Sequence, residues 1–166
     1  PLVRKRINRE SGLGAAYERM FAMQRSGKRF LYLPHIVDCH DNGGTLVVIM
    51  EYVEGETLAD VVYRCDPSLE LASDVFPRLC DAVGELHEGF DPPIIHRDLK
   101  PSNVLVAVRD GHPVPKVIDF GVAKATTSAL GELTLHTERG VLIGTLEYMS
   151  PEQAEMSGLD VDTRTD

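Results

Sequence analysis

The sequence is short of cysteine, short of basic residues and without a long apolar run, and each shortage excludes a class of protein. Its three cysteines are widely spaced, whereas secreted disulfide scaffolds carry them densely, so we expect reduced thiols and a cytoplasmic setting. The 17 basic residues against 26 acidic ones give a formal net charge of -9, which disfavours a nucleic-acid binder. No apolar stretch has the roughly 20 residues that cross a bilayer, although a parent protein could be tethered through a region outside this chain.

What remains is the composition of a folded domain. The 166 residues are 43% hydrophobic and 26% charged, enough for one domain with a core. Residues 10–26 are expected to be helical, because apolar side chains recur at helical spacing from Tyr17 onward. Segments 36–37 and 45–50 are β-branched and apolar and flank an Asp-Asn-Gly-Gly turn, which predicts a hairpin. We expect residues 28–33 to form a surface insertion.

The next segment has the periodicity of a long helix. An apolar stripe runs from Val75 to His87, and Asp74 and Gly89 are the expected residues at its start and end. Pro77 would then stand in the first turn, where its missing N–H does little harm.

Two short apolar segments, 104–108 and 114–118, flank an Asp-Gly turn and predict a second pair of strands. Residues 125–139 are rich in Thr, Ser and Gly without periodicity, which is typical of a long functional loop.

The most informative stretch is His-Arg-Asp-Leu-Lys-Pro-Ser-Asn, starting at His96, with Asp-Phe-Gly following it. Phosphoryl transfer depends on positioning and on charge neutralisation rather than on covalent help from the protein. Asp98 suits the acceptance of a proton from a substrate hydroxyl, and Lys100 offers a positive charge for the phosphate. Asn103 and Asp119 supply the oxygen ligands that Mg²⁺ prefers. The four side chains together fit one chemical constellation.

In this order, the two segments resemble the catalytic loop and metal-binding turn of protein kinases. The string at 144–154, Gly-Thr-Leu-Glu-Tyr-Met-Ser-Pro-Glu-Gln-Ala, is similar to that of bacterial eukaryotic-like serine/threonine kinases, as is the string at 49–58. The resemblance covers about residues 10–166 and implies an α+β, protein-kinase-like two-lobe fold that is incomplete. The implied parts are the C-terminal part of the small lobe at 1–50, a hinge at 51–55 and the N-terminal part of the large lobe at 56–166.

The resemblance also implies three groups of site residues. The catalytic residues are Asp98 and Lys100, and the metal ligands are Asn103 and Asp119. Five residues would bind the nucleotide. The gatekeeper would be Met50, the backbone of Glu51 and Val53 in the hinge would bind the adenine, and the floor of the pocket would be Leu105 and Ile118. The structural and regulatory positions are Glu18, His96, Arg97, Phe120, Gly121, Thr134, Thr137, Thr145, Glu152 and Asp166.

Several regulatory roles follow from the same resemblance. Asp166 would brace the backbone of the catalytic loop, and Glu152 would pair with an arginine outside this chain. Thr134 and Thr137 are the expected phosphorylation sites, and Arg97 would hold the phosphate.

The implied cofactors are ATP and Mg²⁺, with Mn²⁺ as an alternative metal. The implied partners are proteins that present serine or threonine, and the protein itself in trans, with neither nucleic acid nor a membrane segment in this chain. Lys100, two residues after Asp98, and Thr145 resemble serine/threonine rather than tyrosine specificity.

The chain also departs from the family pattern. It has no Gly-x-Gly-x-x-Gly before the first helix and no Val-Ala-Ile-Lys strand; Lys5 and Lys28 are the only lysines before the hinge, and neither has an apolar strand context. The family's helix glutamate maps to Glu18, with Glu10 as the alternative. We therefore expect a kinase domain cut at both ends and inactive by itself. The alternatives are a pseudokinase or scaffold, which a missing lysine would favour, and a small-molecule kinase, which the resemblance to a protein-substrate platform disfavours.

Overall fold

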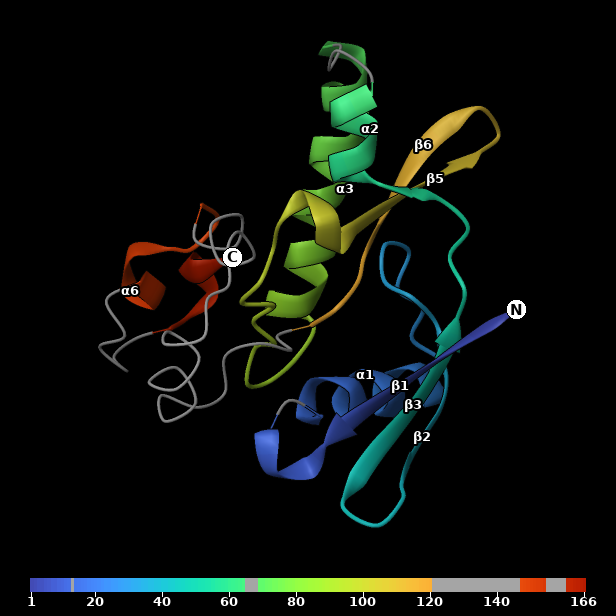
Figure 1. The fold of residues 1–166 in the computed structure, drawn as a ribbon, viewed down its shortest axis with the longest axis vertical. Helices are drawn as coiled ribbons and strands as arrows, with labels where there is room; N and C mark the ends of the chain where they lie inside the picture. The colour runs from blue at the N-terminus through green and yellow to red at the C-terminus, as the bar shows by residue number, and fades with distance from the viewer. Residues whose placement is uncertain (13, 65–68, 121–146, 155–160) are drawn as a thin grey trace, which may run out of the picture.

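The structure is a computed structural model, and it describes most of the chain in five stretches. Two antiparallel sheets of three strands each, with their helices, follow one another along the long axis of the molecule (Figure 1). The predicted mixture of helix and sheet is confirmed. The segment 125–139, expected to be a loop, lies outside the described residues. The described residues are 1–12, 14–64, 69–120, 147–154 and 161–166.

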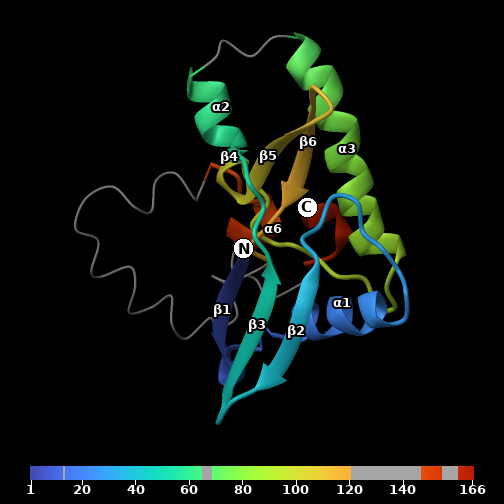
Figure 2. The same cartoon turned by 90° about the vertical axis from the view of Figure 1, so that its right-hand side faces the viewer.

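The first sheet has the strand order β1-β3-β2, and helix α1 covers one of its faces (Figure 2). The predicted hairpin is confirmed, and its turn uses Gly43 and Gly44 at φ 58° and 81°, where a residue with a side chain would be strained. The elements are β1 (Leu2–Asn8), the 3₁₀ helix η1 (Arg9–Ser11), α1 (Ala15–Arg25), β2 (Ile36–Asp41) and β3 (Thr45–Glu51).

The first helix begins later than the sequence predicted. Asn8 caps the short η1 through its side chain, which accepts a hydrogen bond from the backbone N–H of Glu10. Gly12 then ends η1 at φ 68°, so the chain turns before α1 begins. At Gly14 a Cβ atom would lie 2.6 Å from the side chain of Leu46, so the absence of a side chain lets this corner approach the sheet.

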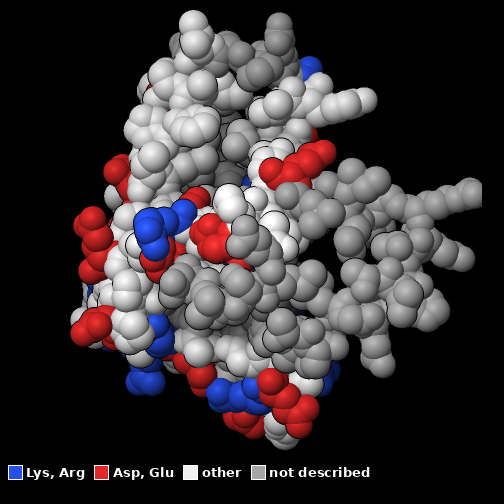
Figure 3. All heavy atoms as spheres, turned by 90° about the vertical axis from the view of Figure 1, so that its left-hand side faces the viewer, with Lys and Arg blue, Asp and Glu red and all other residues white. Residues whose placement is uncertain are grey.

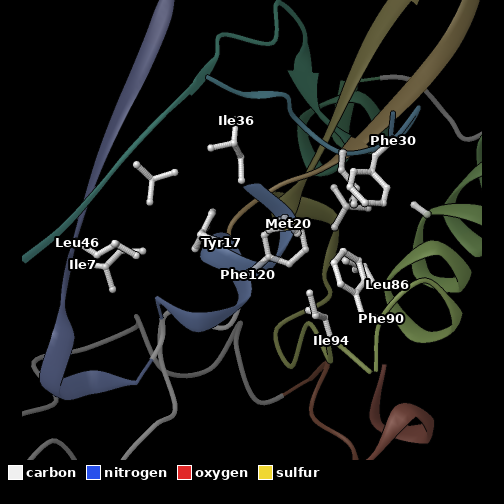
Figure 4. Packing of buried hydrophobic residues seen from close by; sticks show 14 residues of the cluster. Ile7, Tyr17, Met20, Phe30, Ile36, Leu46, Leu86, Phe90, Ile94 and Phe120 are labelled. Carbon is white, nitrogen blue, oxygen red and sulfur yellow. The ribbon is translucent and has the colours of Figure 1, made fainter. Parts of the chain in front are cut away.

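The expectation of a surface insertion at 28–33 is wrong for two of its residues. Phe30 and Leu33 are only 7% and 1% exposed, although Leu31 between them stays in solvent. The ring of Phe30 stacks on that of Phe90, with centroids 5.7 Å apart (Figure 4). The segment therefore joins the first sheet to the second part of the chain, because burying its apolar residues outweighs its polar, loop-like composition.

The second part of the chain carries the sheet with strand order β4-β5-β6. The predicted strand pair is confirmed, and Asp110 and Gly111 form its turn at φ 52° and 81°. The elements are β4 (Glu56–Thr57), α2 (Leu58–Arg64), α3 (Leu69–Glu88), the 3₁₀ helix η2 (Pro101–Asn103), β5 (Val104–Arg109), β6 (His112–Val117), α6 (Pro151–Ala154) and the 3₁₀ helix η3 (Thr163–Thr165).

Helix α3 starts at Leu69, so the prediction that Asp74 caps it is wrong. Pro77 therefore stands inside the helix, where a proline costs about 3 kcal/mol. The cost is offset because Val75, Ala82 and Leu86 are buried along one face of these 20 residues.

One hydrophobic core spans both parts of the molecule. Tyr17 and Met20 of α1 pack in the same cluster as Leu86 of α3 and Phe120 (Figure 4). Residues 52–55 carry no helix or strand and connect the two sheets.

None of the helices in the described stretches is long and apolar enough to cross a membrane. On the face drawn in Figure 3, basic and acidic side chains are interspersed.

Candidate active site

A buried carboxylate holds the backbone of the loop that follows α3. Asp166, whose side chain is 0% exposed, accepts hydrogen bonds from the backbone N–H groups of His96 at 2.6 Å and Arg97 at 2.7 Å. Its Oδ2 also lies 2.9 Å from Nε2 of His87 on α3. The contact expected between Asp166 and the loop backbone is therefore present, and it ties the loop to the long helix.

The ring of His96 crosslinks the loop from within. Its Nε2 lies 2.9 Å from the carbonyl oxygen of Ile118, and its Nδ1 accepts a hydrogen bond from the backbone N–H of Asp98 at 3.3 Å. Burial lowers the pKa of His96, which favours the neutral ring that can donate at Nε2 and accept at Nδ1. The centre of the ring also lies 5.0 Å from that of Phe120, so the catalytic loop packs against Phe120.

The predicted catalytic residues converge on one carboxylate. The side-chain amide of Asn103 donates to the carbonyl oxygen of Asp98 at 2.7 Å and to its Oδ2 at 2.9 Å. Nζ of Lys100 lies 3.1 Å from the same Oδ2. Asp98 is therefore an oriented carboxylate with a positive charge beside it, as the chemistry expected from the sequence requires.

Two residues of the site have a backbone conformation that is uncommon without glycine. Arg97 has φ 67° and Asp119 has φ 60°. Such conformations persist only where surrounding contacts hold them, and they cluster at functional sites. At Arg97 those contacts include the backbone N–H bond to Asp166 and a hydrogen bond from Gln153 Nε2 to its carbonyl oxygen at 2.8 Å.

Sequence analysis missed one residue of this site. Lys5 lies on β1, the strand that precedes η1 and α1, and its Nζ is 2.7 Å from Oδ1 of Asp119. Lys5 does lie on a strand, where it pairs with Val48 of β3, although that strand is mostly exposed rather than apolar. The signal that could have revealed it is the period of two that places Val3, Lys5 and Ile7 on one face of a strand.

The environment of Lys5 favours its charged form. Burial by itself lowers the pKa of Lys5, but Tyr17 and Asp119 act in the opposite direction, and the net effect is a raised pKa. Nζ donates to the hydroxyl oxygen of Tyr17 at 2.9 Å. Lys5 therefore brings a full positive charge to the predicted metal ligand.

The predicted helix glutamate does not meet this lysine. Glu18 is 40% exposed, and its carboxylate lies 2.8 Å from Arg9, which also binds Asp41 at 2.8 Å. The alternative, Glu10, lies in η1 outside the helix. Neither carboxylate is among the ion-pair partners of Lys5 in the described part of the chain.

Two of the predicted nucleotide-binding residues, Glu51 and Val53, lie at the connection between the two sheets. The backbone N–H of Glu51 donates to the carbonyl oxygen of His35 at 2.8 Å, and its carboxylate pairs with buried Lys116 at 3.0 Å. Burial would raise the pKa of Glu51, but the hydrogen bond from Lys116 holds it below its ordinary value. Val53 and Glu51 line a cavity of about 540 Å³ against β5 and β6.

The other three nucleotide positions are not among the residues that line this cavity. Met50 lies on β3, where it pairs with Val3 and Ile36. Leu105 lies on β5, and the backbone N–H of Ile118 donates to the carbonyl oxygen of Asn103 at 2.9 Å. The hinge backbone and the predicted floor therefore do not share the described 540 Å³ cavity.

The remaining predicted positions divide into those inside and outside the described part of the chain. Glu152 of α6 accepts a hydrogen bond from the hydroxyl of Thr165 at 2.7 Å. Phe120 lines a cavity of about 190 Å³ between α1 and the catalytic loop, together with Arg19 and Arg97. Four positions lie outside the described residues, namely Gly121, Thr134, Thr137 and Thr145.

The oxygen ligands expected for a metal suit a hard cation. The amide nitrogen of Asn103 is used by Asp98, so its amide oxygen is the atom left to face a ligand, and Asp119 adds a carboxylate that is 55% exposed. No group of three His, Cys, Asp or Glu side chains that could hold a metal ion exists among the described residues. The set suits Mg²⁺, which is commonly bound by one or two protein oxygens together with substrate phosphates.

Comparisons with known proteins agree with this geometry. A family model described as "Protein kinase domain" matches residues 10–166. Serine/threonine-protein kinase PknB of Mycobacterium leprae is 37% identical over 145 residues, which cover 80% of this chain and 21% of that protein. Serine/threonine-protein kinase pkn3 of Myxococcus xanthus is 43% identical over 123 residues, 70% of this chain and 21% of that protein. The chain thus spans about a fifth of the length of these relatives.

Solved structures give the same fold. The kinase domain of Mycobacterium tuberculosis PknI, a double mutant, matches with a TM-score of 0.58 at 20% identity, over 99% of this chain and 58% of that one. The family match starts at residue 10, after β1, and therefore does not include Lys5. The chain belongs to the protein kinase family, within its bacterial serine/threonine branch.

Proposed function

We propose that the protein containing this chain transfers the γ-phosphoryl group of ATP to serine or threonine hydroxyls of proteins. The observation that carries the proposal is the convergence of Asp98, Lys100 and Asn103 within hydrogen-bonding distance, with Lys5 and Asp119 paired beside them. Positioning and charge neutralisation are what phosphoryl transfer asks of a protein, and these five side chains supply both.

In the proposed reaction the substrate hydroxyl oxygen forms a bond to the γ-phosphorus. The bond from that phosphorus to the bridging oxygen breaks, and ADP leaves with the electron pair. Oδ1 or Oδ2 of Asp98 accepts the hydroxyl proton, and the hydrogen bond from Asn103 fixes the direction of this carboxylate. Lys100, 3.1 Å from Asp98, stabilises the negative charge that develops on the transferring group.

Asn103 and Asp119 would hold Mg²⁺ through their side-chain oxygens. When bound, the ion neutralises phosphate charge. Lys5 would place its ammonium against the phosphates, because its raised pKa keeps it charged and Asp119 directs it to the same place. The adenine would lie against the backbone of Glu51 and Val53, with Met50 as gatekeeper and Leu105 and Ile118 beneath it.

The scaffold alternative was favoured by one feature, the lack of a lysine on a strand before the helix. Lys5 occupies such a strand, which supports the catalytic alternative instead. Serine/threonine specificity draws support from Lys100, two residues after Asp98, and from the names of the relatives.

Control by phosphorylation is part of the proposal. A phosphate on Thr134 or Thr137, added in trans by a second copy, would bring about -1.5 to -2 charges at pH 7. Arg97, whose side chain is exposed, and Arg19 both line the 190 Å³ cavity beside the catalytic loop. A reaction that consumes ATP fits a cytoplasmic location.

The test is a transfer assay on the purified full-length parent, with γ-labelled ATP, Mg²⁺ or Mn²⁺, and a general protein substrate. We expect label on serine and threonine and none on tyrosine after acid hydrolysis. Mass spectrometry of the same protein tests whether Thr134 or Thr137 carries a phosphate. ATP binding without any transfer would instead favour the scaffold.

A further inference from the structure

The lysine at the centre of the proposed site is held by a phenol. Nζ of Lys5 donates to the hydroxyl oxygen of Tyr17 at 2.9 Å and lies 2.7 Å from Oδ1 of Asp119. Tyr17 comes from α1, whereas Asp119 belongs to the Asp-Phe-Gly segment. The ammonium therefore bridges a strand, a helix and the predicted metal-binding turn.

Tyr17 is fixed firmly enough to serve as an anchor. Its side chain is 2% exposed, and its ring meets that of Phe120 edge-to-face, with centroids 5.6 Å apart and planes at 88° (Figure 4). Nζ of Lys5 also lies 5.2 Å from the centre of the Tyr17 ring, within the range of cation–π attraction. The hydroxyl is thus presented to Lys5 by a ring that the core holds in one orientation.

The neighbouring carboxylate does not compete for this role. Successive residues of a helix point about 100° apart, so Tyr17 and Glu18 face different directions. Glu18 faces Arg9, which in turn binds Asp41 at the tip of the β2–β3 hairpin. Helix α1 therefore offers Lys5 a neutral hydrogen-bond acceptor, and the ammonium keeps its charge for Asp119 and for a ligand.

We infer that Tyr17 is a positioning residue of the proposed kinase, whose hydroxyl orients Lys5 toward Asp119 and the phosphates of the nucleotide. The expected effect on turnover rests on the proposed function, whereas the expected effect on nucleotide binding can be measured separately. The hydroxyl of Tyr17 is neutral, so it orients the ammonium by a hydrogen bond without an ion pair. Removing its oxygen atom would therefore remove the orientation of Lys5 and leave the positive charge of Lys5 in place.

The test is Tyr17→Phe in the full-length parent, which deletes the hydroxyl and keeps the ring against Phe120. Loss of a hydrogen bond to a charged group predicts about a 10- to 100-fold fall in kcat/KM for ATP, with most of it in KM. The dissociation constant of Mg²⁺–ATP should rise by a similar factor. Tyr63→Phe is the matched control, because Tyr63 is 96% exposed, and it should stay within about 2-fold of wild type.

A second comparison separates positioning from packing. In a Lys5→Met background, Tyr17→Phe should change the Mg²⁺–ATP dissociation constant by less than about 2-fold, because the hydroxyl acts through the missing amine. A loss of the same size in both backgrounds, or a Tyr17→Phe variant that binds Mg²⁺–ATP like wild type, would overturn the inference. A wild-type parent that transfers no phosphate would refute the proposed function instead, while the binding comparison would still decide the role of Tyr17.

Discussion

The catalytic loop and the strand–helix half of the site, which consists of β1 and α1, hold their functional side chains in place by different kinds of contact. In the loop, the buried carboxylate of Asp166 and the amide of Asn103 hold backbone groups of neighbouring residues. On the other side, Lys5 is held by side chains alone, those of Tyr17 and Asp119. Several hydrogen bonds to the backbone thus hold the loop, whereas the position of the Lys5 ammonium depends on two side-chain contacts with separate elements.

This difference explains why a sequence motif reveals the catalytic loop but not Lys5. The contacts of Asn103 with Asp98 span five residues, so the spacing within one short segment encodes them. Lys5 lies 12 residues from Tyr17 and 114 from Asp119, and no local spacing records those distances. A charge-rich edge strand such as β1, with Ile7 as its only buried residue, also gives little hydrophobic pattern.

The largest expected effect lies in the loop. Asp98→Asn in the full-length parent keeps a hydrogen-bond acceptor for Asn103 but cannot take the hydroxyl proton. We expect kcat to fall about 10²- to 10⁴-fold, with the dissociation constant of Mg²⁺–ATP nearly unchanged. Asp110→Asn is the control, since Asp110 lies in an exposed turn at φ 52° that asparagine tolerates. Turnover close to wild type in Asp98→Asn would remove Asp98 from its proposed role.

The next effect tests the strand–helix half. Lys5→Met removes the charge beside Asp119 while keeping an unbranched side chain, and we expect a fall of about 10²-fold in kcat/KM for ATP. Lys28→Met is the control, since Lys28 lies outside the site, over the ring of Phe30. If the two variants behave alike, Lys5 does not contact the phosphates, and only the loop half of the site would remain.

A smaller effect is expected where the loop is braced. Asp166→Asn replaces one of two acceptor oxygens with an NH₂ group that cannot accept from the backbone of His96 or Arg97. We expect a loss of about 1–3 kcal/mol in local stability, seen as faster hydrogen exchange of those two amides. Asp162→Asn is the control, because asparagine caps η3 as well as aspartate does. Unchanged exchange in Asp166→Asn would mean that other contacts suffice to hold the loop.

Much of the fold followed from the sequence, and the failures have physical causes. Both strand pairs were predicted because β-branched runs flank glycine turns, whereas Pro77 misled the prediction of where α3 starts. A proline inside a helix is unfavourable locally, and the burial of Val75, Ala82 and Leu86 against the rest of the molecule offsets it. Phe30 was similarly missed, since its partner Phe90 lies 60 residues away.

The smallest expected effect decides between the two candidates on α1. Glu18 is the residue to which the family's helix glutamate maps, but it is 40% exposed and binds Arg9, an ion pair of a kind worth only about 0–1 kcal/mol. We therefore expect Glu18→Gln to change kcat/KM for ATP by less than about 2-fold, beside the large loss expected for Tyr17→Phe one residue earlier. A loss of tenfold or more in Glu18→Gln, with Tyr17→Phe unaffected, would show that α1 turns during catalysis to bring the carboxylate to Lys5. In that case the phenol would mark a resting state, and the strand–helix half of the site would be assembled only when nucleotide binds.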